Sequence, residues 1–252
     1  MTFRTLHREP LLLLPGTACD GRVFAPMIER LDGYPVIVGE MRGARTMPDL
    51  ASRLLAAAPA TFALAGFSLG GIAALEMIAQ APQRVTKLAL MDTTARSDPA
   101  ENAAIRRKAA AQARRHGMAG FILDVWPRLV APANTENRAL RETILAMARD
   151  CGPELLAEQT ELAIHRADSR PRLSQIRVPT LVLAGIHEQV CPLDAHREIA
   201  QGIPEAALQL VPDAGHFAPL ENPQAVAGHV LSWLAAEETF IETPRAELRK
   251  LS

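Results

Sequence analysis

Short runs of apolar residues alternate along this chain with longer segments that have helical periodicity. Continuous apolar runs of this length are typical of strands that are buried on both faces of a parallel sheet. We therefore predict six strands of this buried kind, at 11–14, 35–39, 61–66, 87–92, 179–185 and 207–212.

The segments between these runs carry helix start and stop signals. Pro48 lies near the start of a periodic segment, where a missing N–H costs little, and Pro82 ends another. Asn222 is a candidate N-cap, with Pro223 at the first helical position. We expect helices within 22–31, 47–58, 70–82 and 222–237. Strands that alternate with helices predict an α/β fold with a doubly wound, mostly parallel sheet.

One long stretch, 97–177, shows no strand pattern. It reads as several helices, and the residues that punctuate them are Gly117, Pro127, Pro132, Gly152 and Pro153. We therefore predict a helical cap, or lid, at 97–177, inserted between two sheet strands. The core is then formed by 1–96 and 178–252.

Composition and charge argue against some classes of partner. The chain has 252 residues, 48% of them hydrophobic, and a net charge of -1. A nucleic-acid binder usually carries a basic excess, so a nucleic-acid partner is not expected. The N-terminus is polar, and the run 11–14 is too short for a signal segment or a membrane span. We predict a cytoplasmic protein with no membrane partner.

The three cysteines, Cys19, Cys151 and Cys191, are odd in number and widely spaced. Neither a disulfide framework nor a zinc cluster has this pattern. We expect three reduced thiols and no metal site.

The stretch Gly66-Phe67-Ser68-Leu69-Gly70 is the first candidate for chemistry. It follows a predicted strand and precedes a predicted helix, which is the context that gives Gly-x-Ser-x-Gly a mechanism. The small residues on either side allow a tight turn that lifts the serine hydroxyl above the edge of the sheet. We predict that Ser68 is a nucleophile and that the N–H of Leu69, at the helix N-terminus, donates to an oxyanion. A glycine-rich turn that merely tolerates serine is the alternative.

A serine nucleophile needs a base, and the base needs an orienting acid. His216 lies in a loop after the last predicted strand, where a base is held above the serine. The other histidines fall in the N-terminal arm, in predicted helices, or, for His187, beside an acid candidate.

Three motifs, "LLLLPGT", "GFSLGG" and "DAGHF", occur in an order that resembles the α/β-hydrolase superfamily, in particular its small cap-bearing esterase-like members. The resemblance covers nearly the whole chain, to about residue 236. It implies a Ser-acid-His order. Acyl transfer by such a triad needs no metal or organic cofactor.

By this resemblance the acid belongs to a Gly-x-x-Asp-x-x-x-Pro pattern before the histidine strand. Here the pattern runs from Gly185 to Pro192 with Glu188 in place of the aspartate. Glutamate is a permitted acid in this fold. Asp92, at the end of the strand after the nucleophile helix, and Asp194 are rivals.

The resemblance also implies a second oxyanion donor in the loop after the first strand. Similar proteins have His-Gly there, whereas this chain has Pro15-Gly16-Thr17. Gly16 permits the close turn and Thr17 supplies the backbone N–H, but the histidine that usually braces the loop is missing.

The sequence says less about the substrate than about the catalytic residues. The residues expected near it are Phe67 and Phe217, next to the nucleophile and the base, and Phe121 and Trp126 in the insertion. The insertion residues have an alternative interpretation as packing between lid and core. Basic residues of the insertion, which are Arg106, Arg107, Lys108, Arg114 and Arg115, are either a solvated helix face or a docking site for an acidic acyl carrier.

The predicted function is hydrolysis of a small carboxylic ester, or a related lactone or thioester, through an acyl-enzyme. Alternatives are acyl transfer, peracid chemistry or C–C bond hydrolysis by the same triad, and a low-turnover binding protein on the same fold.

Overall fold

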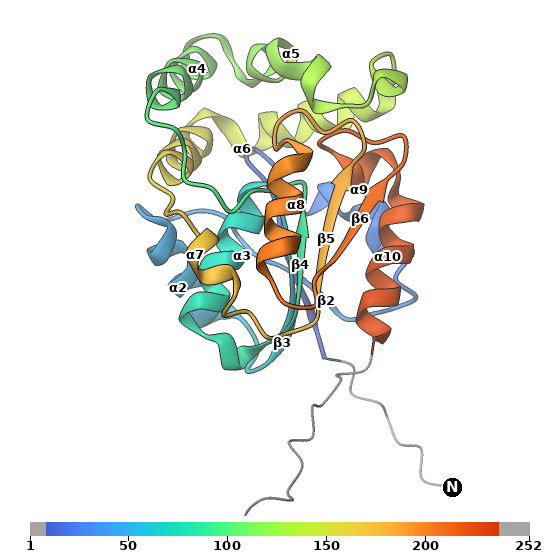
Figure 1. Cartoon of the computed structure of the whole chain (residues 1–252). Coiled ribbons are helices and arrows are strands. Elements are labelled where there is room, and N and C mark those ends of the chain that lie inside the picture. Colours follow the sequence, from blue (N-terminus) through green and yellow to red (C-terminus); the bar gives the residue numbers. More distant parts are fainter. Residues whose placement is uncertain (1–8, 237–252) are drawn as a thin grey trace, which may run out of the picture.

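Six parallel strands form one sheet at the centre of the computed structural model, which describes residues 9–236 (Figure 1). The strand order is β2-β1-β3-β4-β5-β6, and every neighbouring pair is parallel. The strands are β1 (Leu11–Leu14), β2 (Val36–Val38), β3 (Phe62–Phe67), β4 (Val85–Met91), β5 (Thr180–Gly185) and β6 (Ala207–Val211). The α/β class, the mostly parallel sheet and the six strands predicted from the apolar runs are confirmed.

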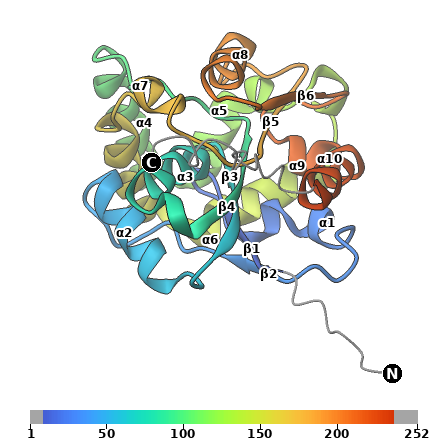
Figure 2. The ribbon, with the colours of Figure 1, turned by 60° about the horizontal axis from the view of Figure 1, so that its bottom comes forward.

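Helices cover both faces of the sheet (Figure 2). On β1, Leu11 and Leu13 face one apolar core and Leu12 and Leu14 face the other, because successive side chains point to opposite faces. The first core packs against α1 (Ala25–Ile28) and α10 (Pro223–Ala235). The second packs against α2 (Met47–Ala57), α3 (Leu69–Gln80) and α8 (Leu193–Gly202). A short helix, α9 (Ala218–Glu221), precedes α10.

The two edge strands correct part of the strand prediction. We expected all six strands to be buried on both faces, but Ile37 and Val38 of β2 are each 38% exposed and Leu210 of β6 is 41% exposed. An edge strand has a neighbour on one side only, so part of its surface stays in contact with water. Apolar character along the run does not reveal this position in the sheet.

The predicted helix signals lie where expected. Pro48 falls in the first turn of α2, α3 ends before Pro82, and the side chain of Asn222 accepts from the Ala225 N–H at 3.1 Å as the N-cap of α10. The segment 22–31 is broken into a 3₁₀ turn, Gly21–Val23, and α1.

Four helices lie between β4 and β5: α4 (Asn102–His116), α5 (Met118–Leu129), α6 (Arg138–Ile164) and α7 (Arg170–Leu173). Helices α4, α5 and α6 lie over one end of the sheet, at the top of Figure 1. Gly117 separates α4 from α5, and Gly152, with φ 76°, kinks α6. Pro127, which we expected between helices, lies inside α5, and this helix ends only two residues later.

Parts of the predicted core, 1–8 and 237–252, lie outside the described residues. Within 9–236, no helix combines the length and the apolar character that crossing a membrane would require.

Candidate active site

Ser68 occupies the tight turn between β3 and α3. Its φ of 53° and ψ of -116° are a strained combination for a residue with a side chain. The backbone around it holds this conformation, since Ser68 N–H donates to Met91 O at 2.9 Å and Ser68 O accepts from the Thr93 hydroxyl at 2.7 Å. A Cβ atom on Gly70 would lie 2.0 Å from Leu14 O, so only glycine permits this close approach of α3 to the sheet.

His216 and Glu188 meet at this turn. His216 Nε2 lies 3.0 Å from Ser68 Oγ, and His216 Nδ1 lies 2.5 Å from Glu188 Oε2. Both side chains are almost completely buried. With the imidazole protonated at Nδ1, Nδ1–H donates to Glu188 and Nε2 accepts the proton of the serine hydroxyl. The three candidates are therefore brought together in one hydrogen-bonded row.

The Glu188 carboxylate is held in its charged form. Burial would raise the pKa of Glu188, but the neighbouring His216 ring and backbone N–H groups outweigh burial and lower this pKa below its ordinary value. Glu188 Oε1 accepts from the N–H of Val190 at 2.5 Å and of Cys191 at 3.1 Å. The extra methylene of glutamate is accommodated because the loop folds back onto its own carboxylate.

In the described part of the chain, neither rival acid forms a hydrogen bond or ion pair with His216. Asp92 is fully buried, its Oδ1 accepts from Gly185 N–H at 2.9 Å, and its Oδ2 has no hydrogen-bond partner among the described residues. Burial, and then the charge of Glu188, raise the pKa of Asp92 well above its ordinary value. Asp194 is exposed and pairs with Arg96 at 3.0 Å. The geometry therefore favours Glu188 as the partner of His216.

A buried cluster of Asp92, Glu188 and His196 brings three potential metal ligands within 4.8 Å of one another. His196 Nε2 accepts from Thr93 N–H at 3.0 Å, and its Nδ1 lies 3.2 Å from Pro192 O, to which it donates. Burial lowers the pKa of His196, which agrees with this neutral form. Because both ring nitrogens and both Glu188 oxygens are already used, this cluster does not offer a set of free metal ligands.

Cys19, Cys151 and Cys191 are free thiols in the structure. Burial raises the pKa of both Cys19 and Cys191 well above the ordinary value. Neither thiol is a reactive thiolate at neutral pH.

The predicted oxyanion donors are the backbone N–H groups of Leu69 and Thr17. Leu69 is the first residue of α3, so its N–H has no acceptor within the helix. The loop after β1 lies against the same turn, since a Cβ atom on Gly16 would lie 3.1 Å from Ser68 Cβ. Thr17, the predicted second donor, follows Gly16 directly.

Glu221 is a positioning residue that the sequence analysis did not single out. Its Oε1 accepts from the N–H of Gly215 at 2.8 Å and of Phe217 at 3.2 Å, on either side of His216. Its Oε2 accepts from Ala131 N–H at 2.7 Å, after α5. One carboxylate thus joins the histidine loop to the insertion. Glu221 lies only five residues after the histidine, but nothing in the local sequence pattern indicated its contact with the insertion.

The predicted substrate contacts separate into two groups. The rings of Phe67 and Phe217 lie against the His216 ring, with centroids 5.2 Å and 5.9 Å away. Trp126 is buried in the apolar core, and its Nε1–H donates to Thr135 O at 3.0 Å. Phe121 lines a groove of about 160 Å³ between α4 and α5. The structure brings the first pair, and not the second, next to the histidine.

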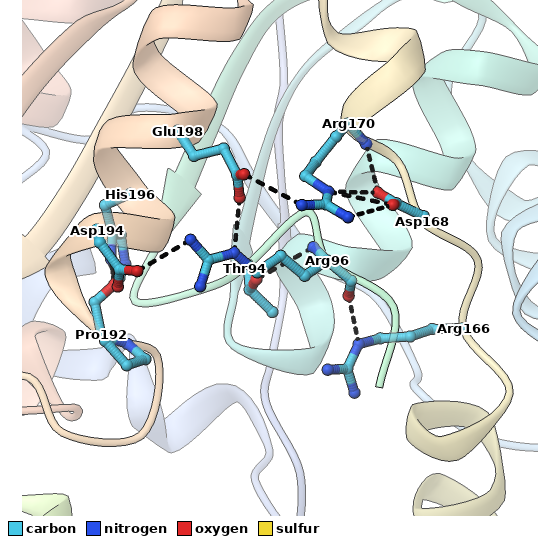
Figure 3. Close-up of polar contacts among 9 residues, drawn as sticks. All are labelled: Thr94, Arg96, Arg166, Asp168, Arg170, Pro192, Asp194, His196 and Glu198. Atoms are coloured by element: carbon cyan, nitrogen blue, oxygen red, sulfur yellow. Dashed lines mark hydrogen bonds and ion pairs between the residues drawn. The ribbon is translucent and has the colours of Figure 1, made fainter. Parts of the chain in front are cut away.

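Ion pairs and a hydrogen bond connect the two ends of the insertion to each other and to α8 (Figure 3). Arg96, after β4, pairs with Glu198 at 2.7 Å, and Arg170, at the start of α7, pairs with Glu198 at 3.3 Å. Arg166 Nε donates to Arg96 O at 2.8 Å. These contacts place the two ends of the insertion beside α8, the helix that follows the loop with Glu188.

Comparison with known proteins decides the family. The sequence model of the alpha/beta hydrolase family matches residues 11–229, most of the chain. The chain belongs to the alpha/beta hydrolase family. The family resemblance inferred from the three motifs is confirmed.

Several named proteins are similar to this chain over nearly their whole length. The chain is 31% identical to a pimeloyl-[acyl-carrier protein] methyl ester esterase of Xanthomonas campestris pv. campestris (strain B100), over 91% of this chain and 96% of that protein. It is 30% identical to a thermophilic esterase from Thermogutta terrifontis, with a TM-score of 0.83 over 90% and 89% of the two chains. The enol-lactonase from Burkholderia xenovorans LB400 shares the fold, with a TM-score of 0.83 at 24% identity over 92% and 94%.

Proposed function

We propose that this alpha/beta hydrolase cleaves carboxylic esters through an acyl-enzyme on Ser68. The observation that carries the proposal is the row of hydrogen-bonding atoms from Ser68 Oγ through His216 to Glu188, at 3.0 Å and 2.5 Å. The names of the similar proteins, which include two esterases, support the same reaction class.

The proposed mechanism follows from which atom donates and which accepts. Ser68 Oγ attacks the ester carbonyl carbon while His216 Nε2 takes the hydroxyl proton. Glu188 holds the imidazole in the Nδ1–H form and stabilises the imidazolium. The N–H groups of Leu69 and Thr17 donate to the oxyanion, and each such donor typically lowers the barrier by about 3 kcal/mol. His216 returns the proton to the leaving alcohol and then activates the water that releases the acid.

The apolar side of the acyl site is proposed to be Phe67 and Phe217, because both rings already lie against His216. Helices α4 to α6 are proposed to act as a lid, and substrate contact by Phe121 and Trp126 remains a prediction. The proposed substrate is a small-molecule ester.

The test is hydrolysis of a panel of p-nitrophenyl esters, lactones and thioesters by wild type and Ser68→Ala. We expect wild-type activity on esters and a fall in kcat of about 10⁴- to 10⁶-fold in the variant. Equal, slow rates for the two proteins would contradict the proposal and would favour a low-turnover binding protein on the hydrolase fold. Competing alcohols in the same assay would reveal acyl transfer by a change of product.

A second candidate is an ester whose acyl chain is attached to a carrier protein. It is favoured by the similarity to a pimeloyl-[acyl-carrier protein] methyl ester esterase and by cations on α4. Arg106, Arg107 and Arg114 are paired with Asp98, Glu161 and Glu154. Among the described residues, Lys108 and Arg115 have no ion-pair partner, and both are exposed, seven positions apart on one face of the helix. These two cations are the proposed contacts for an acidic carrier surface.

A further inference from the structure

A single buried amide joins the insertion to the loop after β1. Gln159 lies in the second half of α6 and is fully buried. Its Oε1 accepts from Ala18 N–H at 2.8 Å, and its Nε2 donates to Met41 O at 3.0 Å. An N–H partner on one side and a C=O partner on the other allow only one orientation of the amide.

The loop that Gln159 contacts has a conformation that needs support. Ala18 has φ 53°, in the left-handed region that alanine rarely adopts. Conformations of this kind persist when the surrounding structure holds them. The amide of Gln159 is the hydrogen-bond acceptor for the N–H of this residue.

The same loop fixes the direction of the Thr17 N–H. Gly16 O accepts from Cys19 N–H at 3.2 Å, inside the turn. In a trans peptide the C=O and the N–H point in opposite directions, so the N–H of Thr17 points out of the turn. The Gln159 contact fixes the next peptide unit, between Thr17 and Ala18. The two peptide planes on either side of Thr17 are therefore both held by hydrogen bonds.

There is little free space between this loop and the nucleophile. A Cβ atom on Gly16 would lie 2.9 Å from the Phe67 ring and 3.1 Å from Ser68 Cβ. A rotation of the turn would thus change the position of the Thr17 N–H relative to Ser68. Small displacements of an oxyanion donor are costly because the donor must point to where charge develops.

We infer that Gln159 is a positioning residue of the oxyanion hole, through which helix α6 of the insertion holds the Thr17 donor in place. This inference rests on the proposed function. It assigns to the insertion a share in transition-state stabilisation in addition to any contact with the substrate.

The neighbouring residue provides a matched control. Glu158 Oε1 accepts from Ala44 N–H at 3.0 Å, so it also joins α6 to a core loop by one hydrogen bond to a backbone amide. That loop does not carry a predicted oxyanion donor. Replacing Glu158 therefore removes a comparable attachment of α6 without touching the loop of Thr17.

The experiment compares Gln159→Met, which keeps the length of the side chain, with Glu158→Met. Gln159→Asn, which is too short to reach Ala18, repeats the test in case the methionine variant does not fold. For each folded protein we would measure kcat and KM on a p-nitrophenyl ester, and the affinity for an alkyl boronic acid, which forms a tetrahedral adduct with an active serine.

We expect Gln159→Met and Gln159→Asn to lower kcat by about 10- to 100-fold, part of the 10²- to 10³-fold effect of losing a whole donor, with KM changed less than about twofold. The boronic acid affinity should fall by a similar factor, and Glu158→Met should keep wild-type values. A kcat within twofold of wild type in both Gln159 variants, or an equal loss in Glu158→Met, would overturn the inference. Absence of esterase activity in wild type would instead contradict the proposed function.

Discussion

The loops that follow β3, β5 and β6 and the helix α4 are held in place by different kinds of contact. In the loops, side chains and backbone are buried and hydrogen-bonded: Glu188 and His216 are almost completely buried, and Gly70 lies against the backbone of Leu14. Helix α4 buries only Ala110 and Ala113, and three of its arginines, Arg106, Arg107 and Arg114, form ion pairs.

This difference indicates where substitutions are tolerated. Exposed ion pairs contribute little to stability, whereas a buried row of hydrogen bonds allows almost no change in atom position. We therefore expect the reaction chemistry to reside in the loops, and substitutions of exposed residues on α4 to leave the fold intact. The second half of α6 is the exception, because Gln159 and Glu158 connect it to core loops by hydrogen bonds to backbone N–H groups.

After the loss of Ser68 itself, the largest effect is expected from substitution of one of the two candidate acids, Glu188 and Asp92. In Glu188→Gln, the amide oxygen can keep the bonds to Val190 and Cys191, and the NH₂ group then faces His216 Nδ1. The imidazole would have to accept there, so Nε2 would carry the proton and could not act as a base. We expect kcat for ester hydrolysis to fall by about 10²- to 10⁴-fold.

The matched variant is Asp92→Asn, which keeps the Oδ1 acceptor for Gly185 N–H. Its kcat should stay within a few-fold of wild type. A larger loss in Asp92→Asn than in Glu188→Gln would show that Asp92 is the acid, and the loop after β4 would then carry the chemistry.

A smaller effect is expected on the stability of the folded protein, which should depend on pH through the ionisation of Asp92. The pKa of Asp92 is raised above its ordinary value of 3.8 in the folded protein. The folded state therefore binds this proton more tightly than the unfolded state does. The stability that Asp92 contributes is fully present below pH 3.8 and is lost as the pH rises through the folded-state pKa.

Asparagine does not titrate, so the difference in melting temperature between Asp92→Asn and wild type isolates this group. We expect the melting temperature of the variant minus that of wild type to become more positive as the pH is raised from 4 to 8. The measurement is thermal unfolding in buffers of equal ionic strength. A difference that is constant or decreases with pH would mean that Asp92 is ionised in the folded protein.

The smallest effect is expected from substitutions of exposed cations on α4. Lys108→Glu combined with Arg115→Glu should lower kcat/KM for a carrier-bound ester by about 10-fold, because charge complementarity acts mainly on association. The rate on a free p-nitrophenyl ester should not change. The control is Arg177→Glu combined with Arg197→Glu, which makes the same change in net charge at exposed positions outside α4. Equal effects of both pairs, or none, would remove the support for a carrier surface on α4.

Much of the fold and the row of site residues was predictable because its signals are local. Buried strands have apolar runs, and a turn that requires glycines on both sides of a serine shows this in five residues. The acid was harder to predict, since both Glu188 and Asp92 follow strands, and only the hydrogen bond between Glu188 and His216 distinguishes them.

The features that sequence reasoning missed depend on contacts between distant segments. Gln159 and Ala18 are 141 positions apart, and a glutamine in a helix carries no mark of the loop it contacts. Glu221 is near His216 in sequence, but its bond to Ala131 depends on where the insertion returns to the core. The exposure of β2 and β6 likewise follows from the strand order, which apolar runs do not encode.

The most direct test of the central claim is labelling with a fluorophosphonate, followed by intact-mass measurement and peptide mapping. The account predicts that one phosphonyl group is added to wild type at Ser68, that Ser68→Ala is not labelled, and that Glu188→Gln is labelled far more slowly. Folded wild-type protein that stays unlabelled, or is labelled at another residue, would contradict the claim that His216 and Glu188 activate Ser68.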